Sequence, residues 1–217
     1  MKKNLWIIGL LGLFMVLTGC KGKKSDIEQI IQNISASESA LTGYTEQDTI
    51  QDGDWIVYSK NISFWLDRTE GVKTKFTQTE QIFSSDSDSP STEMKTEETS
   101  YVTIDDKKYE TINGTEQESA YTVPKYFLTF RLEEDYLEDA YTVNKENNIW
   151  RLTASVKEES IGGFFLNKNV SGITGLSVVL EFTDERLTGF EAKYTSYSGL
   201  PVLMKIAYSY EAVEITR

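Results

Sequence analysis

The sequence predicts an α+β fold in which a large antiparallel sheet curls into a half-barrel, with a few short helices on its concave face. Three successive stretches within residues 176–213 alternate apolar and polar side chains, which is typical of antiparallel strands with one buried face. Turn residues separate further strands at short intervals along the chain. About eight or nine twisted strands cannot stay flat, so we expect the sheet to curl.

The chain begins with the layout of a secretory signal. Two lysines precede an almost wholly apolar run over residues 5–17, and small residues lead from there to Cys20. This run is shorter than the span of about 20 apolar residues that a membrane helix needs. We therefore expect residues 1–19 to be a signal peptide that is removed.

The residues before the expected cut carry a more specific signal. Leu17, Thr18, Gly19 and Cys20 resemble the lipobox of bacterial lipoproteins. This resemblance implies a diacylglyceryl group on the Cys20 sulfur and a protein anchored in the cell membrane, facing its extracytoplasmic side. Two acyl chains supply the two hydrophobic signals that stable anchoring needs. The alternative is an ordinary signal peptide with a cysteine near the cut by chance.

Composition excludes several classes of function. Without the two lysines of the leader, 20 basic residues stand against 34 acidic ones, which argues against binding of nucleic acid. The chain has no histidine, and its only cysteine is Cys20, which excludes His-based triads, Cys/His zinc sites and internal disulfides. Nucleophile elbows and dinucleotide loops are also absent. We predict that the protein is not an enzyme and holds no metal or cofactor.

The first folded element is predicted to be a short amphipathic helix. Ser25 and Glu28 have the spacing of a capping box, and isoleucines recur at helical spacing up to about Ser37. A turn-rich stretch follows and ends in an Asp-Gly pair at Asp52 and Gly53, which favours a hairpin.

Strands are predicted from Trp55 onwards. Ile56, Tyr58, Ile62, Phe64 and Leu66 share one face of the first, and a second runs from Val72 to Phe83. Residues 84–99, rich in Ser, Thr and Asp, are predicted to be a flexible loop. Strands resume at Ser100–Ile104 and Lys108–Ile112.

Residues 124–136 fit two alternatives. Leu128, Phe130 and Leu132 alternate as in a strand, whereas Pro124 and a later acidic run suit a helix. We predict a helix here. A second loose helix is predicted over Ser160–Val170, weakened at Gly162-Gly163 by about 1 kcal/mol for each glycine.

The remaining strands are the clearest. A hairpin joins residues 139–144 to 149–156, and the chain ends with strands over Leu176–Thr183, Phe190–Tyr197 and Val202–Val213. We therefore divide the chain into a signal peptide (1–19), an acylated cysteine with a tether (20–25) and one α+β domain (26–217).

An acylated cysteine, one starting helix, a long antiparallel sheet interrupted by short helices and a final three-strand meander resemble the Lol-type lipoprotein half-barrels, LppX-like proteins included. That family implies an apolar cavity under the half-barrel that holds acyl chains, with loops or helices as a lid. A cone-shaped sheet wrapped on a helix, as in nuclear-transport-factor-like and cystatin-like domains, fits the same pattern.

Two functions remain open. In the first, a membrane-tethered module binds lipid or another apolar ligand, with Gly162-Gly163 in the lid; each candidate lining residue also suits a plain core. These candidates are Trp150, Phe182, Tyr194, Met204, Ile206 and Tyr208.

In the second, a surface-tethered module without a ligand cavity binds an envelope protein or wall polymer. Exposed tyrosines would anchor a basic partner on its acidic surface. These tyrosines are Tyr101, Tyr109, Tyr121, Tyr136 and Tyr141, all of which also suit strands.

Overall fold

The computed structural model describes residues 23–67, 73–82, 95–104, 107–112, 115–120, 128–166 and 171–215. The predicted signal peptide, the lipobox with Cys20 and most of the predicted 84–99 loop lie outside these residues.

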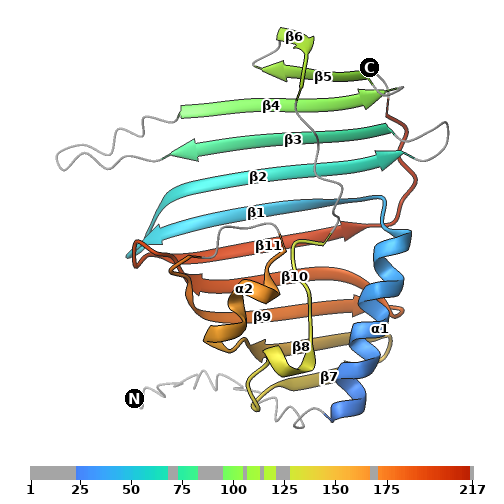
Figure 1. The fold of residues 1–217 in the computed structure, drawn as a ribbon, viewed down its shortest axis with the longest axis vertical. Helices are drawn as coiled ribbons and strands as arrows, with labels where there is room; N and C mark the ends of the chain where they lie inside the picture. The colour runs from blue at the N-terminus through green and yellow to red at the C-terminus, as the bar shows by residue number, and fades with distance from the viewer. Residues whose placement is uncertain are drawn as a thin grey trace, which may run out of the picture.

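The described strands form one antiparallel sheet of eleven strands, in the order β6-β5-β4-β3-β2-β1-β11-β10-β9-β8-β7 (Figure 1). Their bounds are β1 Gly43–Asp52, β2 Trp55–Asp67, β3 Lys73–Ile82, β4 Lys95–Ile104, β5 Lys107–Ile112, β6 Thr115–Glu118, β7 Thr142–Glu146, β8 Ile149–Ser155, β9 Thr174–Thr183, β10 Arg186–Thr195 and β11 Pro201–Ser209.

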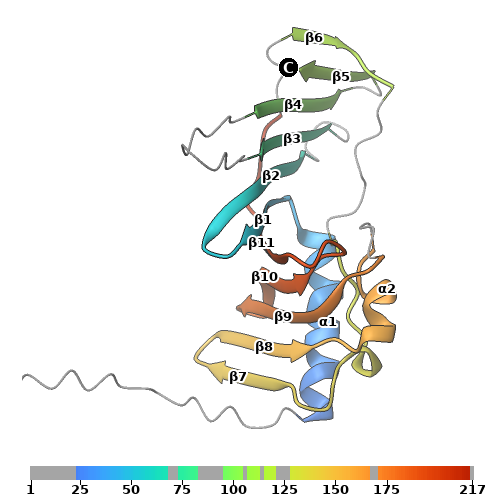
Figure 2. The ribbon, with the colours of Figure 1, turned by 90° about the vertical axis from the view of Figure 1, so that its left-hand side faces the viewer.

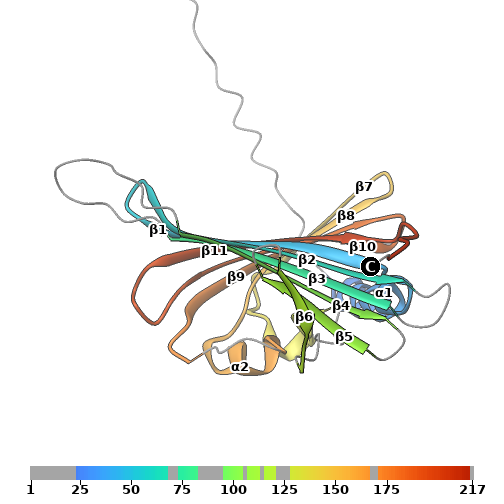
Figure 3. The ribbon, with the colours of Figure 1, turned by 90° about the horizontal axis from the view of Figure 1, so that it is seen from above.

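The first and last strands pair in the middle of the sheet, because β1 lies beside β11. From this pair, β2 to β6 extend the sheet to one edge and β10 to β7 extend it to the other, so the sheet is not closed. Figure 3 shows the twist that accumulates across the strands. The prediction of a curled antiparallel half-barrel is confirmed.

Within the described ranges, two α-helices and two short 3-10 helices accompany the sheet. They are α1 Lys24–Ala40, α2 Ile161–Phe164, η1 Glu134–Tyr136 and η2 Glu158–Ser160. α1 and α2 lie on the same face of the sheet, over the half formed by β7 to β11 (Figure 2). Among the described residues, no helix lies over β2 to β6.

The predicted first helix is confirmed, but its start is different. The backbone N–H of Lys23 donates to Asp26 Oδ2 over 3.1 Å, so the helix begins before Ser25 and within the predicted tether. Ile27 and Ile30 are fully buried, as the isoleucine spacing predicts.

The central strand β1 was not predicted. Its inward positions include Glu46 and Asp48, which interrupt the apolar alternation that identifies strands in sequence. Pairing with β2 and β11 on both sides nevertheless makes this segment a strand, because tertiary context overrides a weak local pattern. The strand β6 was also missed, because all of its residues are polar. In addition, β4 extends over residues 95–99 of the predicted loop.

The helix predicted over residues 124–136 is wrong for most of its described part, and the one predicted over Ser160–Val170 is confirmed only for its first part. Residues 124–127 and 167–170 lie outside the described residues. Residues 128–133 are not helical, and η1 is the helical part of the described residues 128–136. The alternating apolar pattern describes this segment better than the helical one, because Leu128, Phe130 and Leu132 are all buried. The second helix ends at Phe164, since Phe165 instead forms an antiparallel bridge with Phe130.

Candidate functional site on the concave face of the sheet

The pairing of the strands shows which side chains share the concave face. Tyr208, Tyr44, Phe64 and Phe76 follow one another across four neighbouring strands, and all four are buried. Tyr44 stacks on Phe64 with ring centroids 5.6 Å apart. Along this row the apolar face therefore continues from the β7–β11 half into β1, β2 and β3.

A covering layer lies on the β7–β11 half. We use this name for α1, residues 128–137, and α2 with Phe165 and Leu166. Two backbone hydrogen bonds join its inner segments: the Arg131 N–H donates to the Phe164 carbonyl over 2.7 Å, and the Leu166 N–H donates to the Thr129 carbonyl over 2.9 Å. These segments thus form a small ladder that packs on the sheet through its side chains.

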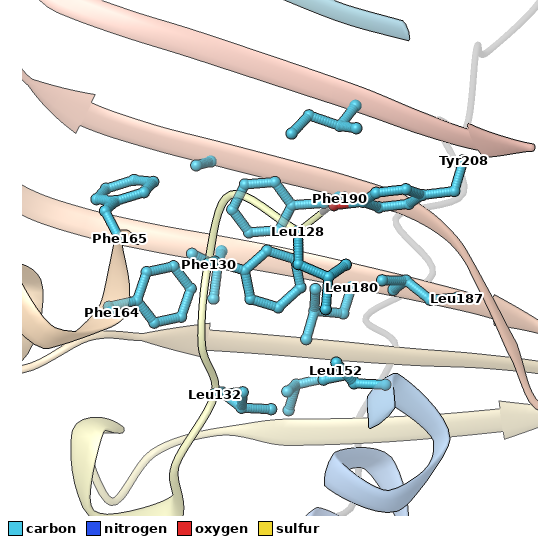
Figure 4. Close-up of a cluster of buried hydrophobic side chains, with 14 of the residues drawn as sticks. Leu128, Phe130, Leu132, Leu152, Phe164, Phe165, Leu180, Leu187, Phe190 and Tyr208 are labelled. Atoms are coloured by element: carbon cyan, nitrogen blue, oxygen red, sulfur yellow. The ribbon is translucent and has the colours of Figure 1, made fainter. Parts of the chain in front are cut away.

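Aromatic stacking joins this layer to the sheet. Phe130 stacks on Phe190 of β10, at 4.5 Å between ring centroids, and on Phe164 of α2, at 5.6 Å, and the rings of Phe164 and Phe190 lie 6.2 Å apart (Figure 4). Phe165 meets Tyr194 edge to face at 6.1 Å. Aromatic pairs of this kind add about 0.5–1.5 kcal/mol each beyond the burial of their area.

The six predicted lining residues all lie in this half of the sheet. Phe182, Met204, Ile206 and Tyr208 are buried in the apolar core, and Trp150 and Tyr194 are partly buried against it. The structure thus brings all six onto one face beneath the covering layer. Phe130 and Phe190, which stack at its centre, were not among the predicted residues.

The predicted lid corresponds to α2. Ile161 and Phe164 are buried, so this short helix rests on the core. Gly163 allows a close approach to η1, because a Cβ at this position would lie 2.8 Å from the Tyr136 hydroxyl. A side chain at this position would therefore push the Tyr136 hydroxyl aside.

The first turn of α1 is fastened to the edge of the sheet. Lys145 of β7 binds Asp26 at 2.6 Å and lies 3.9 Å from the centre of the Trp150 ring. The hydrogen bond from Lys145 lowers the pKa of Asp26, and the bond from the Lys23 backbone adds to this effect.

A polar pair is enclosed where the covering layer meets β11. The hydroxyls of Tyr208 and Thr129 are buried, and neither has a hydrogen-bond partner among the described residues. Burial raises the pKa of Tyr208 well above its usual value, and the nearby Glu46 carboxylate raises it further. Thr129 opposes this shift slightly, although the two hydroxyls do not meet hydrogen-bond geometry.

Beyond the covering layer, apolar side chains of the concave face become exposed. One row across the strands is apolar and runs from Val202 through Ile50 and Tyr58 to Ile82. Exposure rises along this row from 6% at Val202 to 50% at Ile82. Ile112 of β5, which shares this face with the buried Ile62, is 37% exposed.

A polar row separates these apolar positions. Asp48, Lys60 and Glu80 follow one another across β1, β2 and β3. Lys60 Nζ lies 3.9 Å from Glu80 Oε1, which also accepts a hydrogen bond from Gln78 Nε2 over 2.9 Å. The uncovered part of the concave face therefore combines apolar surface with a few fixed polar groups.

The opposite face of the sheet carries a polar trough of about 640 Å³. Ion pairs flank it, from Arg151 to Glu181 at 3.6 Å and from Lys205 to Glu191 at 3.8 Å. Small side chains in neighbouring strands form its floor, namely Ser63, Thr45, Ala207 and Gly189.

Those predicted interface tyrosines whose side chains the structure describes do not line this trough. Tyr136 and Tyr141 are partly buried against the core beside α1 and η1, and Tyr109 is half-buried in β5. The side chain of Tyr101 and all of Tyr121 lie outside the described residues.

No protein-family model matches the chain, and no curated protein matches it. Among solved structures, the fold is similar to the crystal structure of LprF from Mycobacterium bovis, with 10% sequence identity and a TM-score of 0.45. This match covers 88% of the present chain and 95% of LprF. No helix within the described residues is long and apolar enough to cross a membrane.

Proposed function

We propose that this protein is an extracytoplasmic lipoprotein, anchored by acylated Cys20, that binds lipid or another apolar ligand on the concave face of its half-barrel. The observation that carries the ligand proposal is the continuation of the apolar face past the covering layer, where Ile82 and Ile112 are exposed. Exposed apolar surface next to a core is typical of a binding surface.

An acyl chain would lie along the row that leads from Val202 to Ile82. Burial of its apolar surface would supply about 25 cal/mol per Å². The adjacent row with Lys60 and Glu80 would face the polar end of the same ligand, because such sites combine apolar walls with a few placed polar groups.

The predicted lining residues would form the covered continuation of this surface. Entry of a ligand beneath the covering layer would require Phe130 to separate from Phe190. We therefore assign the first contact to the uncovered row and assign the lid role to residues 128–132 together with α2.

Extraction of the purified acylated protein with organic solvent, followed by mass spectrometry, tests this proposal. Solvent removes bound lipid but leaves thioether-linked chains on Cys20, so the two sources are separated. The Ile82→Glu variant should lose most of the extracted lipid, because it places a charge on the apolar row. Gln81→Glu adds the same charge on the other face of β3 and should retain the lipid.

Equal lipid content in both variants, or wild-type protein that yields no lipid, would refute ligand binding on this face. Absence of acyl mass on the peptide that contains Cys20 would refute the anchor.

The second candidate function, an interaction module for a protein or wall polymer, is favoured by the polar trough on the opposite face. A side chain introduced into its floor, as in Ala207→Arg, should then reduce crosslinking to a partner on intact cells. Unchanged crosslinking, or crosslinks to lipid alone, would count against this candidate.

A further inference from the structure

Three elements meet at one edge of the molecule, which we call the anchored end. They are the first turn of α1, the short helix η1 and the C-terminal end of β7. Lys24 binds Glu134 of η1 at 3.2 Å, and Asp26 binds Lys145 of β7 at 2.6 Å. Figures 1 and 2 show α1 beginning beside β7, the outermost strand on this side. These contacts fix the first residues of the helix to the β7 edge of the sheet.

The chain between the acylation site and this edge is very short. Three Cα–Cα steps join Cys20 to Lys23, which reach about 11 Å when fully extended. The headgroup layer of each leaflet is about 5–7 Å thick. An acylated Cys20 therefore cannot hold the anchored end far above the headgroups.

The opposite edge of the sheet lies far from this point. Ten strand spacings separate β7 from β6, which amounts to roughly 48 Å along the sheet. The position of β6 relative to the membrane thus depends on whether the sheet stands on its β7 edge or lies flat.

Charge favours the standing arrangement on an anionic membrane. Lys21 and Lys23 lie at the tether and would each gain about 1 kcal/mol from such a surface, whereas Lys24 is already paired with Glu134. Residues 25–217 carry 17 basic side chains against 34 acidic ones. The surface would therefore attract the tether and repel the remainder of the protein.

We infer that the anchored protein stands on the lipid surface by its β7 edge, with α1, η1 and the β7–β8 hairpin near the headgroups and β6 directed away. This inference rests on the proposed acylation of Cys20. The ligand row at Ile82 in β3 then lies seven strand spacings, or about 34 Å, from the membrane edge. Its ligand must consequently leave the bilayer before it binds.

Two matched cysteine variants test the orientation in the full-length acylated protein. Glu146→Cys and Glu118→Cys place a thiol on the exposed end of β7 and of β6, and Cys20 is blocked by its acyl group. Each thiol carries a fluorophore, and the protein is reconstituted into vesicles of phosphatidylethanolamine and phosphatidylglycerol with a quencher-labelled lipid.

Quenching at position 146 should exceed quenching at position 118 by about twofold or more, since the two strands lie roughly 48 Å apart along the sheet. A flexible Gly/Ser insertion of about 20 residues after Gly22 should reduce this difference, because the tether then no longer fixes the edge. Equal quenching at both positions, or stronger quenching at 118, overturns the orientation alone. Protein that does not float with the vesicles overturns the anchor, and the orientation with it.

Discussion

Phe130 and Phe190 stack at 4.5 Å between ring centroids with their planes only 12° apart. Phe130 belongs to an extended segment without regular secondary structure, whereas Phe190 lies in β10. This pair therefore fixes an irregular segment to the sheet. Within the described residues, the backbone of residues 128–132 bonds to residues 164–166, so side-chain packing such as this stack holds this part of the covering layer on the sheet.

Phe130→Ala should lower the free energy of unfolding by about 3–5 kcal/mol, because it removes a buried ring and leaves a cavity. Phe130→Leu fills most of the space and should cost less. Urea denaturation followed by tryptophan fluorescence measures both variants. A cost below about 1 kcal/mol for the alanine variant would show that the layer does not depend on this ring.

Gly43→Ala should destabilise the protein by about 1–3 kcal/mol through overpacking. A Cβ at this position would lie 2.3 Å from Trp65 Cε3 and 2.6 Å from the Phe64 carbonyl oxygen. Gly189→Ala is the matched control in the neighbouring half of the sheet, since its Cβ would meet Glu181 at an ordinary 3.4 Å. Thermal unfolding should separate the two variants, and equal melting temperatures would contradict this account.

The ion pair between Asp26 and Lys145 should make the free energy of unfolding depend on pH. The pKa of Asp26 is lowered in the folded protein, so its contribution is present above the unfolded value near 3.8 and is lost as pH falls through the folded value. Asp26→Asn should cost up to about 1 kcal/mol at neutral pH, as for other largely exposed pairs, and almost nothing at pH of about 2. Urea midpoints at both pH values test this, and a cost that does not vary with pH would refute it.

Tyr208→Phe should stabilise the protein by about 1 kcal/mol at neutral pH, because it removes a buried hydroxyl that has no partner in the described part of the chain. The pKa of Tyr208 is raised in the folded state, so its contribution is complete below the unfolded value near 10 and falls as pH rises above it. The advantage of the variant should therefore grow in alkaline solution. Destabilisation by this substitution would show that the hydroxyl is in fact satisfied.

Sequence periodicity predicted those elements whose local pattern agrees with their place in the fold. The isoleucines of α1 and the alternating residues of β9 to β11 are of this kind. β1 could not be predicted, because Glu46 and Asp48 occupy inward positions and only the neighbouring strands make the segment a strand.

Only part of the candidate site could be predicted from the sequence. Residues on the apolar face, such as Phe182 and Met204, were identifiable from alternation alone. The partners that cover them were not, because Phe130 reaches Phe190 across about sixty residues of sequence through an irregular segment. Such a contact carries no local signal.

Photolabelling with a diazirine-bearing fatty acid, followed by peptide mapping of the full-length protein, tests the central claim most directly. Concave-face binding predicts labels on β2 and β3, centred on Tyr58 and Ile82, that unlabelled lipid competes away. Labels confined to the trough residues of the opposite face, or labelling that no lipid displaces, would contradict it.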